Sequence, residues 1–391
     1  MKILYVSQWL SEIGGGGEIV FRDLAYGMIE YGHEVDVISQ RHTSLQDTGS
    51  ADRLSIHRVG PELSGPPPPS FRENLAFGIY AILKGSQIIR NKKTDIIHAN
   101  NLTSAVIGTV LSRLFALPLI ITVHILFAKS QDNFWRTWGA QPNVSQISSR
   151  IAPLIEKLIV KVDADAIHTV TNATKLDLIE YGTKSNVVVI PNGIMLDEYD
   201  KVGATIEYQD YVIFIGRLVF NKNLGLVIDS FVEVARRLPH AKLIVVGDGP
   251  MKPMWERLSV NLNLQSNIIF KGFVSHETKI ELLSKCSALL MPSSMEGLTL
   301  TVMEAFAMYK PVLIPEVTAS NEAVDEGVDG FILPLNNPLK WSEKIILLLS
   351  DKRITSKMGQ NARTKVEKKF NQKRVIAEIN SLYEQIIGKY S

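Results

Sequence analysis

Short apolar segments alternate with longer segments of helical periodicity along almost the whole chain of 391 residues. Continuous Val, Ile and Leu runs of this kind are typical of parallel strands that are buried on both faces. In the first half of the chain the pattern predicts strands at Ile3–Val6, Glu34–Ile38, Ile96–His98, Leu119–Val123, Ala166–Val170 and Val187–Ile190. In the second half it predicts strands at Tyr211–Ile215, Lys242–Val246, Asn267–Phe270, Ala288–Met291, Pro311–Ile314 and Gly330–Leu333.

A polar stretch without clear periodicity, Leu196–Gln209, separates the two series of strands. The predicted strands are too many for one doubly wound sheet of usual size. We therefore expect two α/β domains. The N-terminal Rossmann-like domain should span residues 1–200, and the C-terminal Rossmann-like domain residues 205–374. Ligands of open parallel sheets bind beyond the carboxyl ends of the strands. The two domains are therefore expected to face each other across a central cleft that holds the active site.

Composition and charge narrow the class of function. The chain has 42 basic and 40 acidic residues, a net charge of +2. Nucleic-acid binders carry a much stronger basic footprint, so we expect no nucleic-acid partner. The single cysteine, Cys286, excludes a disulfide framework and a thiolate zinc site.

No apolar segment fits a signal peptide or a membrane span. Residues 1–10 have too short an apolar run, and Leu102–Ala128 is interrupted by Arg113 and a proline. We therefore expect a cytoplasmic protein. The segment Lys352–Arg374 holds nine basic residues and one acidic residue, Glu367. A solvated helix face explains it most simply, and peripheral contact with anionic lipids on the inner face of the membrane is the alternative.

Glycines and basic residues follow two of the predicted strands. Gly14–Gly17 come after the first strand and precede a helix expected from near Glu18, an arrangement that lets a ligand approach the backbone and the helix N-terminus. A surface turn is the alternative, and the G-x-G-x-x-G dinucleotide fingerprint is not satisfied. Gly216-Arg217-Leu218 follows another strand, with Lys222 five residues after Arg217. An Arg fork and a Lys point charge suit a diphosphate, although basic loop residues are often just solvated.

Two glutamates, Glu296 and Glu304, enclose seven residues after the strand Ala288–Met291. If a helix begins at Leu298, they lie about 12 Å apart along it. That separation is too large for a retaining-glycosidase pair, but it suits hydroxyl groups at opposite ends of an elongated ligand. Helix amides between them would favour an anion. The alternative is one capping glutamate and one exposed glutamate.

Two further patterns are weaker. Asp163-Ala-Asp165 has the spacing of a D-x-D metal motif, but it leads into a strand, and we interpret it as a chance match. His124 ends the strand Leu119–Val123 and is able to face the cleft, although a lone histidine there is more often structural.

Taken in order, these elements resemble the family-4 glycosyltransferases with the GT-B fold. The resemblance covers almost the whole chain and is carried by Gly15-Gly16, Gly32-His33-Glu34-Val35, Asp95-Ile-Ile-His98, Thr122-Val-His124, Ile190-Pro-Asn-Gly193, Gly216-Arg-Leu218 with Lys222, Val246-Gly-Asp-Gly249, Phe270-x-Gly272, Glu296-x7-Glu304 and Lys310-Pro-Val312. The chain departs from the family pattern at Thr299, where Gly or Pro is usual, and at Tyr309, where Gly is usual.

The resemblance implies sugar transfer from a UDP- or GDP-linked donor to a glycan, lipid-linked or small-molecule acceptor. It further implies retention of the anomeric configuration, without a metal or other cofactor. Glu296, at the transferred sugar, and His124, reaching it from the first domain, become the catalytic residues. The donor-binding residues become Gly15, Gly16, Arg217, Lys222, Leu298, Thr299 and Leu300 at the diphosphate, Glu304 at the ribose and Val274 near the base. The final helix, near Val375–Ile387, is expected to cross back onto the first domain.

Three other functions fit the residues less well. A non-catalytic sugar-nucleotide-binding protein would be expected to lose Arg217, Lys222 or a motif glutamate, and all are present. A GT-B sugar-nucleotide epimerase would not be expected to carry the E-x7-E element. A nicotinamide-dependent oxidoreductase needs a glycine fingerprint and a downstream acidic residue, which neither half supplies together. The residues favour the transferase and give no indication of oligomeric state.

Overall fold

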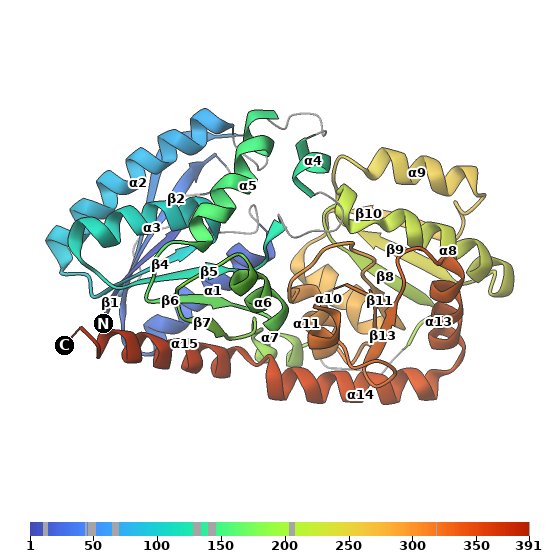
Figure 1. The fold of residues 1–391 in the computed structure, drawn as a ribbon. Coiled ribbons are helices and arrows are strands. Elements are labelled where there is room, and N and C mark those ends of the chain that lie inside the picture. Colours follow the sequence, from blue (N-terminus) through green and yellow to red (C-terminus); the bar gives the residue numbers. More distant parts are fainter. Residues whose placement is uncertain are drawn as a thin grey trace. The chain divides into compact units, whose positions relative to one another are not determined.

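A computed structural model describes residues 1–10, 15–43, 45, 52–64, 70–127, 134–139, 146–202, 208–317 and 319–390 (Figure 1). Contacts divide the chain into two compact units, Met1–Pro191 with Lys373–Ser391, and Asn192–Gln372. The first boundary therefore falls earlier than the predicted 200–205. The reason is that Asn192 and Tyr199 hydrogen-bond to residues of the second unit, at Leu298 and Glu304.

The first unit is built on seven parallel strands in the order β3-β2-β1-β4-β5-β6-β7. The strands are β1 (Lys2–Ser7), β2 (Glu34–His42), β3 (Leu54–Leu63), β4 (Ile96–Asn100), β5 (Leu119–Val123), β6 (Ala166–Thr169) and β7 (Val187–Val189). The helices are α1 (Gly16–Glu30), α2 (Phe71–Lys92), α3 (Asn101–Phe115), α4 (Phe134–Gly139), α5 (Gln146–Val160), α6 (Asn172–Glu180) and the C-terminal α15 (Gln372–Ile387).

Alternation along the strands gives this sheet two cores. Ile3 and Tyr5 of β1 pack in one hydrophobic cluster with residues of α1 and α15. Leu4 and Val6 point to the opposite face and pack with residues of α2, α3 and α5. The last helix of the chain thus completes one of the two cores of the first unit.

The edge strand β3 is the strand that the sequence pattern missed. Most of its residues are only partly buried, so they do not form a continuous apolar run. The strand also contains Gly60 and Pro61, which are typical of turns. A proline is tolerated here because β3 pairs with one neighbour only.

The second unit is built on six parallel strands in the order β10-β9-β8-β11-β12-β13. The strands are β8 (Tyr211–Ile215), β9 (Lys242–Val246), β10 (Ile268–Gly272), β11 (Ala288–Leu290), β12 (Val312–Pro315) and β13 (Gly330–Leu333). Its helical segments are α7 (Leu196–Asp200), the 3-10 turn Phe220–Lys222, α8 (Leu224–Arg237), α9 (Lys252–Asn261), α10 (His276–Lys285), α11 (Leu300–Ala307), α12 (Ser320–Ala323), α13 (Pro338–Ser350) and α14 (Lys352–Lys369).

The basic segment Lys352–Arg374 forms α14 and the start of α15. Several of its basic side chains have acidic partners, at 2.8 Å for Arg363 with Asp200 and 2.9 Å for Lys365 with Asp329. These pairs give part of the segment a structural role. Within the described ranges, no helix is long and apolar enough to cross a membrane.

Candidate active site

Each sheet has one point at which the strand order reverses, between β1 and β4 in the first unit and between β8 and β11 in the second. Open parallel sheets bind ligands at such a point, beyond the carboxyl ends of the strands. Arg217 follows β8 and Glu296 follows β11, while Gly15 follows β1. The predicted residues therefore stand beside the two reversal points, and each unit is described separately below.

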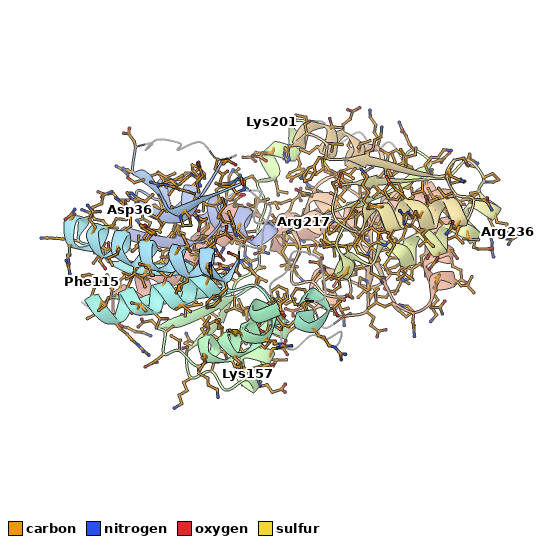
Figure 2. The ribbon with its side chains drawn as sticks, turned by 90° about the horizontal axis from the view of Figure 1, so that it is seen from above. Asp36, Phe115, Lys157, Lys201, Arg217 and Arg236 are labelled. Carbon is orange, nitrogen blue, oxygen red and sulfur yellow. The ribbon has the colours of Figure 1, made fainter. Side chains whose placement is uncertain are left out.

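In the second unit, the loop that carries Arg217 is fixed by a glycine loop after β9. The backbone N–H of Gly216 donates to the Val246 carbonyl (3.0 Å), and that of Leu218 donates to the Asp248 carbonyl (2.8 Å). Arg217 lies between these two anchors, and its side chain is exposed (Figure 2). The sequence motif around Gly247 thus acts on Arg217 through the backbone.

Gly247→Ala is expected to weaken nucleoside diphosphate binding about tenfold or more, equivalent to roughly 1.4 kcal/mol. Gly247 has a φ of 126°, and an added Cβ would lie 2.0 Å from the carbonyl oxygen of Gly216. The substitution displaces the Arg217 loop without removing a charge. Calorimetric titration of UDP and GDP measures the effect. Gly225→Ala is the control, since a Cβ there meets only ordinary contacts; equal affinity in both variants would refute the role of the loop.

The structure brings Lys222 and Glu296 together. The backbone N–H of Ser294, after β11, donates to the carbonyl of Asn221 (2.8 Å) and so joins the two loops. The ammonium group of Lys222 forms an ion pair with Glu296, and both side chains are largely buried. An ammonium group has three donors, so Lys222 keeps donors for a phosphate oxygen while it is bonded to Glu296.

The helix after Glu296 begins later than predicted. Leu300 is the first residue of α11, with Thr299 as its N-cap, so Glu296 lies in the preceding loop and the 12 Å helical separation was wrong. The segment is held out of the helix because the Asn192 amide donates to the Leu298 carbonyl (2.6 Å). The Thr299 hydroxyl donates to the sulfur of Met291 (3.3 Å) and does not cap the helix amides.

Glu304 lies on α11 with a largely buried carboxylate, only 10% exposed. Its Oε1 accepts hydrogen bonds from Lys279 (2.7 Å) and from the Tyr199 hydroxyl (3.1 Å). Lys279 comes from α10, which begins two residues after the half-buried Val274. Sequence reasoning singled out neither Lys279 nor Tyr199, because both reach Glu304 only through the fold.

In the first unit, Gly17 makes room for His124. A Cβ on Gly17 would lie 3.0 Å from Cδ2 and 3.1 Å from Nε2 of the imidazole, whereas a Cβ on Gly16 would meet open space. Gly15 is the N-cap of α1, with a φ of 132°, and the helix begins at Gly16 rather than near Glu18. Gly14 lies outside the described residues. Within the glycine cluster Gly14–Gly17, His124 lies beside Gly17, whereas the sequence analysis assigned only Gly15 and Gly16 to the site.

His124 is held by Asn100, at the end of β4. Its Nε2 lies 3.1 Å from the Asn100 amide oxygen, and the amide nitrogen of Asn100 donates to the Ser7 hydroxyl (3.2 Å). That second bond orients the amide, so the imidazole donates from Nε2. Burial of the imidazole lowers the pKa of His124 to about 3. Electrostatic repulsion from the nearby His168 makes a smaller contribution in the same direction. The imidazole is therefore neutral at pH 7.

Two more histidines, His98 and His168, lie near His124 and share a hydrogen-bond network with Thr122. Burial lowers the pKa of His168 to about 4 and holds that of His98 well below its usual value, so both rings are neutral at pH 7. A carbonyl oxygen only accepts, so His168 Nε2 donates to Ile190 (2.9 Å), and in the neutral ring Nδ1 accepts from the Thr122 hydroxyl (3.0 Å). The Thr122 oxygen then accepts from His98 Nε2 (2.6 Å), so each ring is held in one tautomer.

The network continues into the C-terminal helix. Because His98 donates from Nε2, its Nδ1 accepts from the Tyr383 hydroxyl (2.5 Å), which in turn accepts from the Tyr5 hydroxyl (2.8 Å). All three side chains are fully buried. The network therefore joins α15 to β4, whose neighbour β5 ends directly before His124.

Stability is expected to fall as the pH drops from about 6.5 toward 4. Burial lowers the pKa of His168 to about 4 and holds that of His98 well below its usual value, whereas an unfolded histidine titrates near 6.5. Between these values the unfolded state binds more protons, so each histidine removes up to about 1.4 kcal/mol of unfolding free energy per pH unit. Urea denaturation at several pH values measures this slope.

The matched variant is His168→Gln. A glutamine amide is able to donate to Ile190 and to accept from Thr122, but it does not titrate. We expect a shallower loss of unfolding free energy between pH 6.5 and 4 in this variant. A slope equal to that of the unmodified chain would mean that His168 does not couple protonation to folding.

Asp165 of the Asp163-Ala-Asp165 pattern has a structural role. Asp165 accepts from the backbone N–H of Leu119 (2.8 Å) and from the Tyr390 hydroxyl (2.8 Å). It thereby ties the start of β6 to the neighbouring β5 and to the C-terminus. In the part of the chain that the structure describes, no group of three or more His, Cys, Asp or Glu residues is arranged to hold a metal ion.

Comparison with known proteins identifies both units. Residues 14–198 match the family described as Glycosyltransferase Family 4, and residues 197–365 match Glycosyl transferases group 1. An uncharacterised glycosyltransferase of Methanocaldococcus jannaschii is 26% identical and covers 98% of each chain.

Two solved structures show the same fold. Sucrose-phosphate synthase from Thermosynechococcus elongatus has a TM-score of 0.81 at 20% identity and covers 99% of each chain. The Anabaena protein HepE, solved in complex with UDP-glucose, has a TM-score of 0.75 at 20% identity and covers 98% of this chain and all of its own. The chain is therefore a glycosyltransferase of the GT-B fold, in which residues 14–198 resemble the family-4 glycosyltransferases and residues 197–365 resemble the group 1 glycosyl transferases.

Proposed function

We propose that the chain transfers a sugar from a UDP- or GDP-linked donor to a glycan, lipid-linked or small-molecule hydroxyl, with retention of anomeric configuration and without a metal ion. One observation carries the proposal. Two cations, Arg217 and Lys222, and two carboxylates, Glu296 and Glu304, gather on neighbouring loops and one helix beside the reversal point of the second sheet. HepE was solved with UDP-glucose, which favours a UDP-linked donor over a GDP-linked one.

The charges fit the bond changes in this reaction. The bond from the anomeric carbon to the diphosphate breaks, and a bond to the acceptor oxygen forms as the acceptor hydroxyl loses its proton. Negative charge accumulates on the leaving diphosphate, where Arg217 and Lys222 stabilise it in place of a metal. Positive charge develops on the sugar, where Glu296 is suited to stabilise it, while Glu304 holds the ribose hydroxyls.

His124 fits a hydrogen-bonding role better than that of a general base. A general base works best with a pKa near the operating pH, and the pKa of His124 is about 3. The Nε2–H bond to Asn100 fixes the orientation of the ring. We assign His124 to binding of the transferred sugar, which agrees with a retaining reaction in which His124 does not act as a general base.

Calorimetric titration of UDP, GDP, ADP and NADH in excess chelator tests the donor site. Tight binding of one nucleoside diphosphate would support a metal-independent donor site and would name the base. Binding of NADH alone, or of none of the four, would refute the proposal.

The anomeric outcome needs a second measurement. With the donor identified, NMR of the first sugar released or transferred reports whether its anomeric configuration equals that of the donor. An inverted product would refute retention and leave the donor assignment intact.

A further inference from the structure

The two carboxylate oxygens of Glu304 have different surroundings. Oε1 accepts hydrogen bonds from the Lys279 ammonium group (2.7 Å) and from the Tyr199 hydroxyl (3.1 Å). Each oxygen of a carboxylate has two lone pairs, so these two donors fill Oε1. Among the residues that the structure describes, none donates a hydrogen bond to Oε2. Oε2 is therefore the oxygen that a ligand would meet, and the 10% of the side chain that stays exposed lets a ligand reach it.

Helix α11, which carries Glu304, is held at both ends. Before its first turn, the Asn192 amide donates to the Leu298 carbonyl (2.6 Å). At its last residue, Nη1 of Arg363 on α14 donates to the Ala307 carbonyl (3.0 Å). Because the backbone is fixed in this way, the direction of the Glu304 carboxylate depends on the rotamer of its side chain. The two donors at Oε1 are the groups that set this rotamer.

Lys279 contributes more to this orientation than Tyr199 does. Its side chain is only 22% exposed, so the ion pair with Glu304 is largely shielded from water. A hydrogen bond between two charged groups is also shorter and stronger than one with a neutral donor, and the bond from Lys279 is the shorter of the two. Lys279 comes from α10 and Tyr199 from α7, so two separate helices hold one oxygen in place.

We propose that Lys279 is a positioning residue through which the donor site selects a ribonucleotide over a 2′-deoxyribonucleotide. The proposal rests on the proposed function, in which Glu304 holds the ribose hydroxyls. With Oε1 filled, both the 2′ and the 3′ hydroxyl would donate to Oε2, whose two lone pairs suffice for them. A 2′-deoxyribose lacks one of these donors and leaves a largely buried, charged oxygen one hydrogen bond short, which is costly.

Removal of Lys279 is expected to weaken this selection. The Glu304 carboxylate would then have two open oxygens and no charged donor to fix its direction. The ribose contact would become loose, and the absence of the 2′ hydroxyl would cost less. The alternative is that Lys279 binds the diphosphate with its remaining donors. In that case its removal would weaken ribonucleotides and 2′-deoxyribonucleotides by the same factor.

Calorimetric titration of UDP and 2′-deoxy-UDP, and of GDP and 2′-deoxy-GDP, tests the proposal. For the base that it binds, we expect the unmodified chain to prefer the ribonucleotide by about tenfold or more. The preference is expected to fall to about threefold or less in Lys279→Met, and Lys279→Arg, which keeps a charged donor, is expected to retain most of it. The matched control is Lys285→Met on the same helix, because Lys285 also pairs with a glutamate, Glu281 (2.7 Å).

Tyr199→Phe tests the same oxygen independently. It removes one neutral donor from Oε1, so the preference is expected to fall by a smaller factor than in Lys279→Met. Thermal unfolding shows whether each variant folds; if Lys279→Met does not, an unchanged preference in Tyr199→Phe overturns the proposal.

Two further results would overturn the proposal and leave the donor assignment intact. One is a Lys279→Met variant that folds and keeps the full preference for the ribonucleotide. The other is an unmodified chain that binds a nucleoside diphosphate and its 2′-deoxy form equally well. Failure to bind any nucleoside diphosphate is a different result, since it refutes the proposed function and this proposal together.

Discussion

Glu304→Ala is expected to abolish measurable binding of the nucleotide-sugar donor, while Glu296→Ala mainly lowers turnover. Glu304 is a largely buried carboxylate that is oriented by Lys279 and Tyr199. In the proposed function its loss removes the acceptor for the ribose hydroxyls, and it leaves the Lys279 charge without its partner, which is costly where water is scarce. Glu296 lies in a loop, and in the proposed reaction it acts at the sugar, where charge develops only as the bond breaks.

Calorimetry for the affinity and initial rates for the turnover separate the two effects. Glu281→Ala on α10 is the control, because Glu281 is an exposed carboxylate that pairs with Lys285. Equal donor affinity in Glu304→Ala and the unmodified chain would refute the assignment of Glu304. A Glu296→Ala variant with normal turnover would likewise remove Glu296 from the reaction.

Arg217→Gln is expected to weaken nucleoside diphosphate binding by about 2–5 kcal/mol, as for a charged hydrogen bond that becomes desolvated on binding. The guanidinium group presents paired donors to phosphate oxygens, and a glutamine of similar length has neither the charge nor the fork. Calorimetric titration of UDP and GDP at two salt concentrations measures the loss. The control is Arg236→Gln, an exposed arginine on α8 that pairs with Glu233 (Figure 2). Unchanged affinity of Arg217→Gln would mean that this loop does not contact the donor.

Much of the fold was accessible from the sequence because buried parallel strands are continuous apolar runs. The runs identified every strand except β3, whose edge position makes its residues only partly buried. The start of α11 was placed too early at Leu298, because periodicity does not register the bond from Asn192 to the Leu298 carbonyl. The local pattern thus predicts where the elements lie, whereas a long-range hydrogen bond such as that from Asn192 to Leu298 determines where a helix begins.

The sequence predicts those residues of the candidate site that directly follow the ends of strands. Arg217 and Glu296 were placed correctly after their strands, since the residues after parallel strands share one edge of the sheet. Lys279 was not singled out and Gly17 was not assigned to the site, because their contacts join segments that are distant in sequence. Lys279 reaches Glu304 from another helix, and Gly17 is needed only because an imidazole occupies the space beside it.

The return of α15 to the first unit has a consequence for synthesis on the ribosome. Ile3 and Tyr5 share their hydrophobic cluster with residues of α15, at the far end of the chain. Domains generally fold as they are made, N-terminal part first. Helix α1 covers part of this face early, but the part that α15 covers stays exposed until α15 has been made, after the second unit. The first unit is therefore completed only after the second, and a chain cut short before α15 would expose part of an apolar sheet face.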